Sequence, residues 1–449
     1  MKVRLKDGVF VRHFDDESVI VCPRTGGCTV MQDARPFLEC LSKAWREVDE
    51  IQATLATKFA CRPEDLLDDV YAIIGELESQ GFSERDGWIE GSADPDRLHE
   101  TVGGLSVERG EDSGNPFGEF CSRHRMLSEL HMDLTDRCNE RCVHCYVPKG
   151  GHATMPTDLA LKVIQEFRAM EGLTLYVSGG ECLLHPDFAM ILREAKRLDL
   201  NIIVMSNLMA CNDATVSLVK EIDPQFVNVS LYSMKPTEHD AITGVAKSWE
   251  KTMAAIRSLK SEGVHVRLAT PILRENKDAV EDLQKFAAEM QMHDVVDCDI
   301  IGRMDHDCTN QDHALTLDEA QKFMREHRAI LGLEEFDEKR CVPDSRVCEI
   351  GDFKLNVNAR GDYYPCDGGQ GIVLGNAKKD ALRDVWCGDK LNELRTLKNR
   401  DFPRCVACPN RPWCKVCVVR NFNETGDVFT PSQRRCDITA MHREILEDK

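Results

Sequence analysis

The sequence predicts an α/β protein with an additional unit at each end. From Glu129 onward, short β-rich runs alternate with amphipathic helices, which is typical of parallel strands joined by crossover helices. Paired strand-like runs precede this section, and nine cysteines follow it, all from Cys341 onward. A chain of 449 residues is long enough for about three domains.

Composition argues against several functions. A formal net charge of −20 disfavours a large nucleic-acid interface, which needs a basic face. No apolar stretch approaches the roughly 20 residues of a membrane span, and Met1–Asp7 is charged, unlike a secretory signal. We therefore expect a cytoplasmic protein with neither nucleic acid nor a membrane as partner. Because cytosol keeps thiols reduced, 21 cysteines indicate metal rather than disulfides.

Residues 1–85 are predicted to form a small winged-helix-like domain, in which strands around the Gly26–Gly27 turn precede three helices. Residues 86–127 are polar and rich in glycine, which predicts a linker. The predicted strands are Val3–Arg12, Ser18–Cys22 and Cys28–Met31, and the predicted helices are Ala34–Trp45, Val48–Phe59 and Pro63–Gln80.

Residues 128–335 are predicted to form the catalytic core. Together with the strand that leads into Cys138, the β-rich runs make six strand–helix units. In such α/β folds the functional side chains gather at the carboxyl ends of the strands. The other five strands are predicted at Leu173–Ser178, Asn201–Ser206, Phe226–Leu231, His265–Thr270 and Val295–Ile300, and one clear amphipathic helix is Thr157–Met170.

Three cysteines follow the first core strand with CxxxCxxC spacing: Cys138, Cys142 and Cys145. Such a loop supplies three thiolates to a four-iron cluster and leaves the fourth iron without a protein ligand. The alternative is a zinc site or simply buried thiols. Zinc would need a fourth ligand and normally a second ligand pair along the chain, and adjacent His144 is awkwardly placed to serve.

This spacing, followed directly by Tyr146, resembles the motif of the radical S-adenosylmethionine (radical SAM, AdoMet) superfamily. The resemblance implies an open (β/α)6 barrel and a [4Fe-4S] cluster whose open iron is chelated by the amino and carboxylate groups of AdoMet. An electron from the cluster, supplied by a reducing partner such as flavodoxin or ferredoxin, would break the sulfonium bond. The resulting 5′-deoxyadenosyl radical abstracts hydrogen from carbon.

Polar residues at the strand ends match the AdoMet-binding positions of that family. Gly179-Gly180-Glu181 matches its GGE motif, in which glycines let the backbone approach the cofactor and the carboxylate accepts from the methionyl ammonium. A structural role in the local loop is the alternative for the other candidates. By resemblance, Ser206 and Asn207 take the place of a Thr-Asn pair, Ser230 would bond the ribose hydroxyls, and Arg267 could reach the AdoMet carboxylate.

Residues 336–449 resemble the SPASM domain, whose signature is CxnGx4C, then CxxCx5CxxxC, then a last cysteine; here two residues instead of three separate the final pair. The resemblance implies two auxiliary [4Fe-4S] clusters, three in the whole chain. If Cys341 or Cys417 does not bind, the first cluster has an open iron that could take a substrate thiolate. Zinc is the alternative, although its usual ligand spacing is absent. The implied ligands are Cys341, Cys348, Cys366 and Cys417 for the first cluster, and Cys405, Cys408, Cys414 and Cys436 for the second.

Asp367 follows Cys366 directly. In SPASM enzymes that oxidise a sulfatase residue, an aspartate at this place takes the substrate's proton, so the resemblance implies a catalytic role here. The alternative is a cap on the Gly368–Gly369 turn.

The three segments together resemble maturases of ribosomally synthesised and post-translationally modified peptides (RiPPs). Residues 1–85 would then bind the leader of a precursor peptide as an added β-strand, and the core would form an intramolecular crosslink, a cysteine thioether. The alternatives are a carbon–carbon crosslink, epimerisation, formylglycine formation in a sulfatase, and a non-enzymatic iron–sulfur electron carrier.

Overall fold

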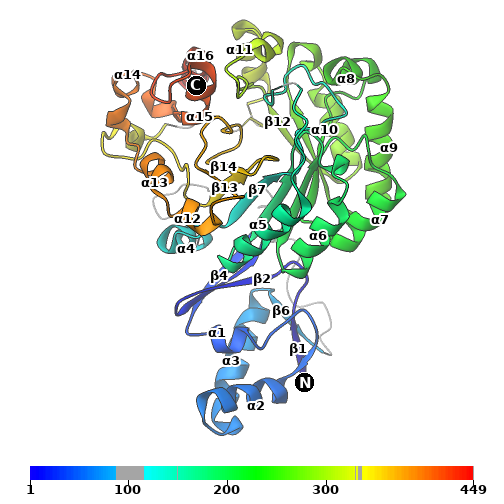
Figure 1. The fold of residues 1–449 in the computed structure, drawn as a ribbon, viewed down its shortest axis with the longest axis vertical. Helices are drawn as coiled ribbons and strands as arrows, with labels where there is room; N and C mark the ends of the chain where they lie inside the picture. The colour runs from blue at the N-terminus through cyan, green and yellow to red at the C-terminus, as the bar shows by residue number, and fades with distance from the viewer. Residues whose placement is uncertain (87–115, 149, 329, 332–335, 448–449) are drawn as a thin grey trace. The chain divides into compact units, whose positions relative to one another are not determined.

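The computed structural model describes residues 1–86, 116–148, 150–328, 330–331 and 336–447 (Figure 1). The chain forms two compact units. Unit 1 contains Met1–Ser128 with Arg168–Leu173 and Asp199–Asn201, and unit 2 contains the remainder. None of the helices in the described ranges combines the length and apolar character of a membrane span.

Unit 1 contains two small antiparallel sheets, of order β5-β1-β6 and β2-β3-β4. One face of α2 and one of α3 bury Ile51, Leu55 and Ile74 against the first strand, and burial of such side chains is the main stabilising contribution. The elements are β1 Lys2–Leu5, β2 Phe10–Phe14, β3 Glu17–Cys22, β4 Gly27–Gln32, α1 Arg35–Leu38, β5 Arg46–Glu47, α2 Val48–Phe59, η1 Pro63–Leu66, α3 Leu67–Ser79 and β6 Ser83–Arg85.

Two predictions for this unit were wrong in detail. The predicted strand Val3–Arg12 is interrupted where Gly8 adopts φ +79°, and its halves enter different sheets. The predicted helix Ala34–Trp45 is only one turn, because the Ser42 carbonyl accepts from the Leu5 amide (2.9 Å) and the chain continues as a partner strand of β1. Here long-range pairing outweighs local helical propensity.

The segment predicted as a linker, 86–127, lies largely outside the described residues. Its last part forms helix α4 (Pro116–His124). Phe117 and Phe120 give this helix an apolar face, which packs with Phe10 and Val19 of the β2-β3-β4 sheet. The last part of the predicted linker is therefore helical, and the i, i+3 spacing of Phe117 and Phe120 is consistent with a helix.

Unit 2 is built on a nine-stranded sheet of order β12-β11-β10-β9-β8-β7-β13-β14-β15. The strands from β7 to β12 are the six predicted ones. β7 pairs in parallel with β8, and β9 to β12 pair in parallel with one another, which confirms the predicted α/β class. They are β7 Glu129–Asp133, β8 Thr174–Ser178, β9 Asn201–Ser206, β10 Phe226–Ser230, β11 Val266–Pro271 and β12 His293–Asp297.

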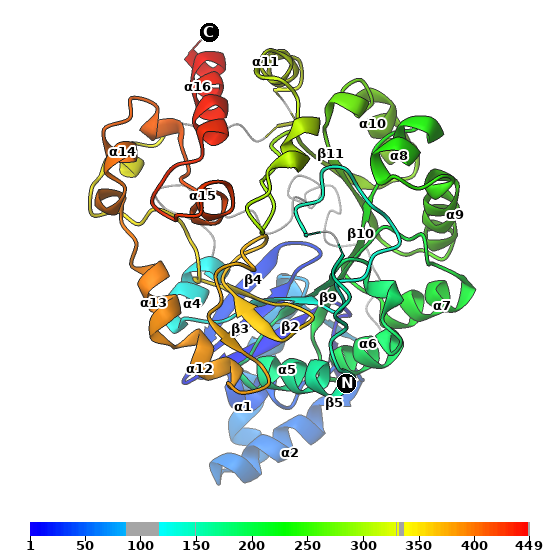
Figure 2. The same cartoon turned by 45° about the horizontal axis from the view of Figure 1, so that its top comes forward.

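The two faces of these strands differ in polarity. On β7, Leu130 and Met132 are fully buried apolar residues, whereas Glu129, His131 and Asp133 alternate with them on the other face. Figure 2 shows helices following one another around the outside of the strands. They are α5 Thr157–Ala169, α6 Phe188–Arg197, α7 Asp213–Ile222, α8 Pro236–Thr243, α9 Ser248–Ser261, α10 Val280–Glu289 and α11 Leu317–Glu326.

The cysteine-rich end adds three strands to this sheet, which the sequence did not predict. β13 pairs with β7 in parallel, so that Lys354 lies beside Glu129 and Asn356 beside His131. The elements are η6 Glu338–Cys341, β13 Lys354–Val357, β14 Asp362–Tyr364, β15 Gly375–Asn376, α12 Leu382–Trp386, α13 Asp389–Arg395, η7 Asn399–Asp401, α14 Pro403–Val406, η8 Arg411–Trp413, α15 Val418–Thr425 and α16 Gln433–Glu447.

Candidate functional site

The CxxxCxxC loop follows the carboxyl end of β7, where the sequence places it. Burial raises the pKa of Cys138 to about 12, and nearby Glu181, Glu140 and Cys145 add to the shift. Burial also raises the pKa of Cys142 well above its ordinary value, again with a contribution from Cys145. The three thiols are thus close neighbours. Since iron binds the thiolate, loading this site would release protons.

Gly179 and Gly180 hold this loop by close backbone contact. The Gly180 amide donates to the Thr135 carbonyl (2.7 Å), and a Cβ on Gly179 would lie 2.5 Å from that oxygen. A Cβ on Gly180 would lie 2.5 Å from the Arg137 carbonyl oxygen. The sequence predicts that these glycines let the backbone approach the cofactor. The close approach in the structure is to the loop that carries Cys138.

A second clamp holds the same loop from its other side. The amides of Arg141 and Val143 donate to the carbonyls of Thr243 (2.8 Å) and Ile242 (3.0 Å) at the end of α8. Gly244 follows with φ +66°, and a Cβ there would be 3.3 Å from the Arg141 carbonyl. These contacts are missing from the sequence-based site because nothing in the local pattern links residues a hundred positions apart.

Glu181, Ser206 and Asn207, which are predicted to bind AdoMet, contact one another. The Glu181 carboxylate is 1% exposed and accepts from the Ser206 hydroxyl (2.7 Å), the Asn207 amide (2.8 Å) and the Leu183 amide (3.0 Å). Burial raises the pKa of Glu181. The Asn207 side chain donates to Asn139 Oδ1 (2.7 Å) in the cysteine loop. Glu181 therefore joins the ends of β8 and β9, and its predicted bond to the AdoMet ammonium stays a prediction.

Ser230 and Arg267 occupy different levels of the sheet. Ser230 ends β10 at the carboxyl edge, beside Ala269. Arg267 lies near the amino end of β11, where its Nε donates to Asn228 (2.8 Å) and its guanidinium lies 4.1 Å above the Phe226 ring. This placement favours a structural role for Arg267, while the position of Ser230 suits the predicted ribose contact.

The Asp367 carboxylate is held by three side chains of the sheet. Its Oδ1 accepts from Asn356 Nδ2 (2.6 Å) and lies 3.1 Å from His131 Nδ1. Its Oδ2 lies 3.1 Å from Lys354 Nζ. Nevertheless 46% of the side-chain surface is exposed, so one side of the carboxylate stays open to a reactant.

Neighbouring opposite charges determine the protonation states of His131 and Asp367. Burial by itself would lower the pKa of His131, but Asp367 and Asp133 outweigh it and raise that pKa to about 9. Burial would raise the pKa of Asp367, but Lys354 and His131 outweigh it and hold it well below its ordinary range. At neutral pH the pair is therefore an imidazolium and a carboxylate.

The turn-cap alternative for Asp367 is not what the structure shows. The Gly369 amide closes the turn by donating to the Cys366 carbonyl (2.9 Å). The Asp367 side chain points its hydrogen-bonding atoms at β7 and β13 instead.

His131 links two carboxylates. Its Nε2 lies 3.5 Å from Asp133 Oδ1, and Asp133 Oδ2 accepts from the Tyr364 hydroxyl (2.6 Å) and from Gln370 (3.0 Å). Both ring nitrogens therefore face an acceptor, as an imidazolium requires. His131 is not among the site residues predicted from the sequence, although its position between apolar Leu130 and Met132 indicates a polar strand face.

Tyr146 connects the two cysteine-bearing regions. Burial raises its pKa, and Asp133, Asp367, Cys145 and Cys366 are the neighbouring acidic groups that add to the shift. Tyr146, which follows Cys145 directly, therefore lies near Asp367 and Cys366. A Cβ on Gly368 would lie 3.9 Å from the Tyr146 ring.

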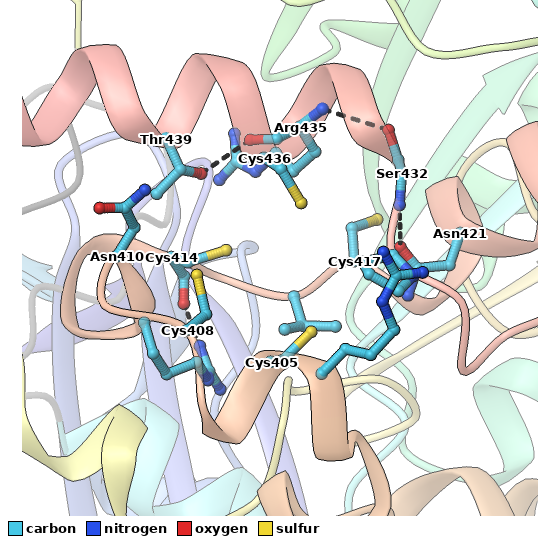
Figure 3. A pocket seen from close by; sticks show the side chains of 14 residues that line it. Cys405, Cys408, Asn410, Cys414, Cys417, Asn421, Ser432, Arg435, Cys436 and Thr439 are labelled. Carbon is cyan, nitrogen blue, oxygen red and sulfur yellow. Dashed lines mark hydrogen bonds between the residues drawn. The ribbon is translucent and has the colours of Figure 1, made fainter.

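Five late cysteines, Cys405, Cys408, Cys414, Cys417 and Cys436, line a cavity of about 200 Å³. Figure 3 shows the sulfur atoms of Cys405, Cys408, Cys414 and Cys436 directed into this common space. Burial and the other three thiols raise the pKa of Cys405 to about 11. These are the four cysteines predicted to hold the second auxiliary cluster, and their grouping fits a four-thiolate site.

Three of the other four predicted ligands form a second group. Burial raises the pKa of Cys366 to about 12, and nearby Asp367, Cys417 and Cys348 add to the shift. The short spacing after Cys414 thus leaves Cys417 beside Cys366 and Cys348, where its Sγ also accepts from the Arg420 amide (3.4 Å). Cys341 is exposed in η6, which bonds to η8 through the Asp337 amide and the Pro412 carbonyl (3.0 Å).

The zinc alternative finds no support in this geometry. Within the ranges that the structure describes, no three Cys, His, Asp or Glu side chains converge closely enough to hold a single metal ion. A four-iron cluster is larger, because each thiolate binds a different iron atom. The donor sets therefore fit clusters.

Comparison with known proteins agrees with this site. Residues 132–287 match the radical SAM superfamily, and residues 348–409 match SPASM, described as an iron–sulfur cluster-binding domain. The chain is a radical SAM enzyme that carries a SPASM domain, and its cofactors are [4Fe-4S] clusters and AdoMet.

Several individual proteins are similar to this chain. The antilisterial bacteriocin subtilosin biosynthesis protein AlbA of Bacillus subtilis is 23% identical over 68% of this chain and 72% of its own. Pre-heme d1 synthase of Dinoroseobacter shibae is 24% identical over 69% and 85%. The crystal structure of Streptococcus suis SuiB bound to precursor peptide SuiA has a TM-score of 0.63 at 14% identity, covering 97% and 100% of the two chains. The resemblance to RiPP maturases is confirmed, and the SuiB fold is shared.

Proposed function

We propose that this protein modifies a precursor peptide and joins one of its cysteines to a carbon atom through a thioether. The observation that carries the proposal is the partly exposed side chain of Asp367, which directly follows Cys366 and lies near Tyr146 at the end of the CxxxCxxC loop. Thioether formation removes the proton of the peptide cysteine thiol. An ionised carboxylate beside the reacting atoms can accept that proton.

The chemistry divides among the parts of the chain as follows. When bound at Cys138, Cys142 and Cys145, the cluster and AdoMet supply the radical that removes a hydrogen atom from a peptide carbon. Formation of the carbon–sulfur bond then releases one proton and one electron from the peptide. Asp367 takes the proton, and the electron leaves toward the auxiliary centres, from which it passes to an oxidised flavodoxin or ferredoxin.

The thiolate of the substrate also has a place to bind. Cys348, Cys366 and Cys417 are grouped, whereas Cys341 is exposed and packed against η8. Three protein thiolates would leave the first auxiliary cluster with one open iron. A peptide cysteine bound there would lie next to Asp367, which supports a thioether over the carbon–carbon crosslink.

Unit 1 supplies the peptide-binding surface in this proposal. Among the described residues β4 pairs only with β3, so its other edge is free to take an added strand. A leader peptide bound at that edge gains backbone hydrogen bonds. SuiB, which has a similar fold, is bound to precursor peptide SuiA in its crystal structure, and this supports a precursor peptide as the partner here.

Co-expression with a short cysteine-containing peptide encoded nearby tests the proposal. Mass spectrometry should show the loss of a pair of hydrogen atoms per crosslink, and the linked cysteine should no longer react with iodoacetamide. The same mass loss with every cysteine still alkylated would show a carbon–carbon crosslink. An unchanged mass with inverted stereochemistry would show epimerisation, and a sulfatase substrate would indicate formylglycine formation.

A further inference from the structure

Arg411 is a buried cation in the wall of the cavity into which Cys405, Cys408, Cys414 and Cys436 point. It lies in η8 between Cys408 and Cys414, and only 2% of it is exposed. Its Nη1 donates to the Cys414 carbonyl and its Nη2 to Asn399 Oδ1. Its Nε is buried and has no hydrogen-bond partner.

The charge of Arg411 lacks a carboxylate partner. Among the described residues none forms an ion pair with it, whereas Arg420 and Arg435 of the same domain both pair with Asp299, at 2.6 and 3.2 Å. A buried charge without a counter-charge is strongly destabilising. The groups of the same cavity that can carry a negative charge are cysteine thiols, among them Cys405, Cys408 and Cys414. In their thiolate form they can supply the counter-charge that Arg411 lacks.

We propose that Arg411 is the built-in counter-cation of the auxiliary centre held by Cys405, Cys408, Cys414 and Cys436, and that it raises the reduction potential of that centre. Four thiolates give a [4Fe-4S] site a net negative charge, and reduction adds one more. A fixed cation in a region shielded from water stabilises the reduced form more than the oxidised form. Arg411 thus makes this centre a better acceptor of the electron that an oxidative reaction releases.

The test is a potentiometric titration followed by electron paramagnetic resonance. The chain with Cys138, Cys142 and Cys145 replaced by alanine removes the signal of the first cluster and leaves the SPASM signals. In this background Arg411→Gln should lower one midpoint potential. At a fixed solution potential the ratio of reduced to oxidised centre should fall about tenfold, which is 59 mV for one electron.

Arg404→Gln is the matched control, because Arg404 lines the same cavity but is exposed to solvent. It removes the same charge where water screens it, and should shift the potential much less. No shift in the Arg411→Gln variant, or equal shifts in the two variants, would overturn the proposal.

The glutamine variant could fail to hold the cluster. Iron content is therefore measured in this variant and in Arg411→Lys. Lysine keeps the charge but loses the planar fork of donors. Retention of iron with lysine and its loss with glutamine would support the role of the charge. Loss of iron in both variants would overturn it in favour of hydrogen bonding alone. The inference depends on the SPASM assignment and not on the peptide product, so an unmodified peptide leaves this result intact.

Discussion

His131 Nδ1 lies 3.1 Å from Asp367 Oδ1, and this contact joins the first strand of the barrel to the residue that follows a SPASM cysteine. The contact sets the charge of both groups. It also joins Asp367, the proposed proton acceptor, to the strand that leads into the CxxxCxxC loop. Several expected properties of the protein depend on it.

The first prediction concerns stability and pH. The pKa of His131 rises from 6.5 to about 9 on folding, so its stabilising contribution is complete below pH 6.5 and is lost as the pH rises through 9. The difference in unfolding free energy between wild type and His131→Gln should therefore shrink between pH 6.5 and 9, by on the order of 2–3 kcal/mol. Denaturant unfolding of both proteins at several pH values in this range measures that difference. A difference that stays the same at every pH would contradict the ion pair.

The second prediction concerns Asp367. Asp367→Asn keeps the shape but removes the proton acceptor, so peptide crosslinking should fall by roughly 10²-fold or more. Formation of 5′-deoxyadenosine should persist, because hydrogen abstraction precedes proton transfer. Liquid chromatography of both products gives the comparison. Asp389→Asn, on an exposed helix of the same domain, is the control; equal crosslinking by the two variants would remove Asp367 from the mechanism.

The third prediction concerns the glycine contact. A Cβ at position 180 would lie 2.5 Å from a carbonyl of the cysteine loop, so Gly180→Ala should displace that loop. We expect iron at the first site to be lost and AdoMet cleavage to fall about tenfold or more, equivalent to about 1.4 kcal/mol. Gly75→Ala, which meets nothing within 4 Å, should leave both unchanged. Normal iron content in Gly180→Ala would show that the glycine is dispensable.

Sequence alone predicts the parallel strands because their periodicity and turn signals are local. It also predicts the grouping of Glu181 with Ser206 and Asn207, since neighbouring parallel strands end at one edge. It could not predict that β13 pairs with β7, because this register joins residues more than two hundred positions apart. The contacts of Asp367 with Lys354 and His131 depend on this long-range pairing, so they cannot be predicted from the local sequence.

The late cysteines illustrate the same limit. Their spacing predicts two sets of ligands. In the structure Cys405, Cys408, Cys414 and Cys436 line one cavity, while Cys417 both lines that cavity and lies near Cys348 and Cys366. The place of Cys341 depends on the packing of η6 against η8, which no spacing rule contains. Arg411 lies within the cysteine pattern, but the pattern does not predict its environment. Its burial, and the lack of a carboxylate partner among the described residues, are seen only in the structure.

The most direct measurement of the central claim is 5′-deoxyadenosine formation by the anaerobically reconstituted, reduced protein. Wild type should cleave AdoMet, and replacement of Cys138, Cys142 and Cys145 by alanine should abolish cleavage while iron stays bound at the SPASM cysteines. Cleavage that survives the triple replacement, or a wild-type protein that forms no 5′-deoxyadenosine with or without peptide, would contradict the account.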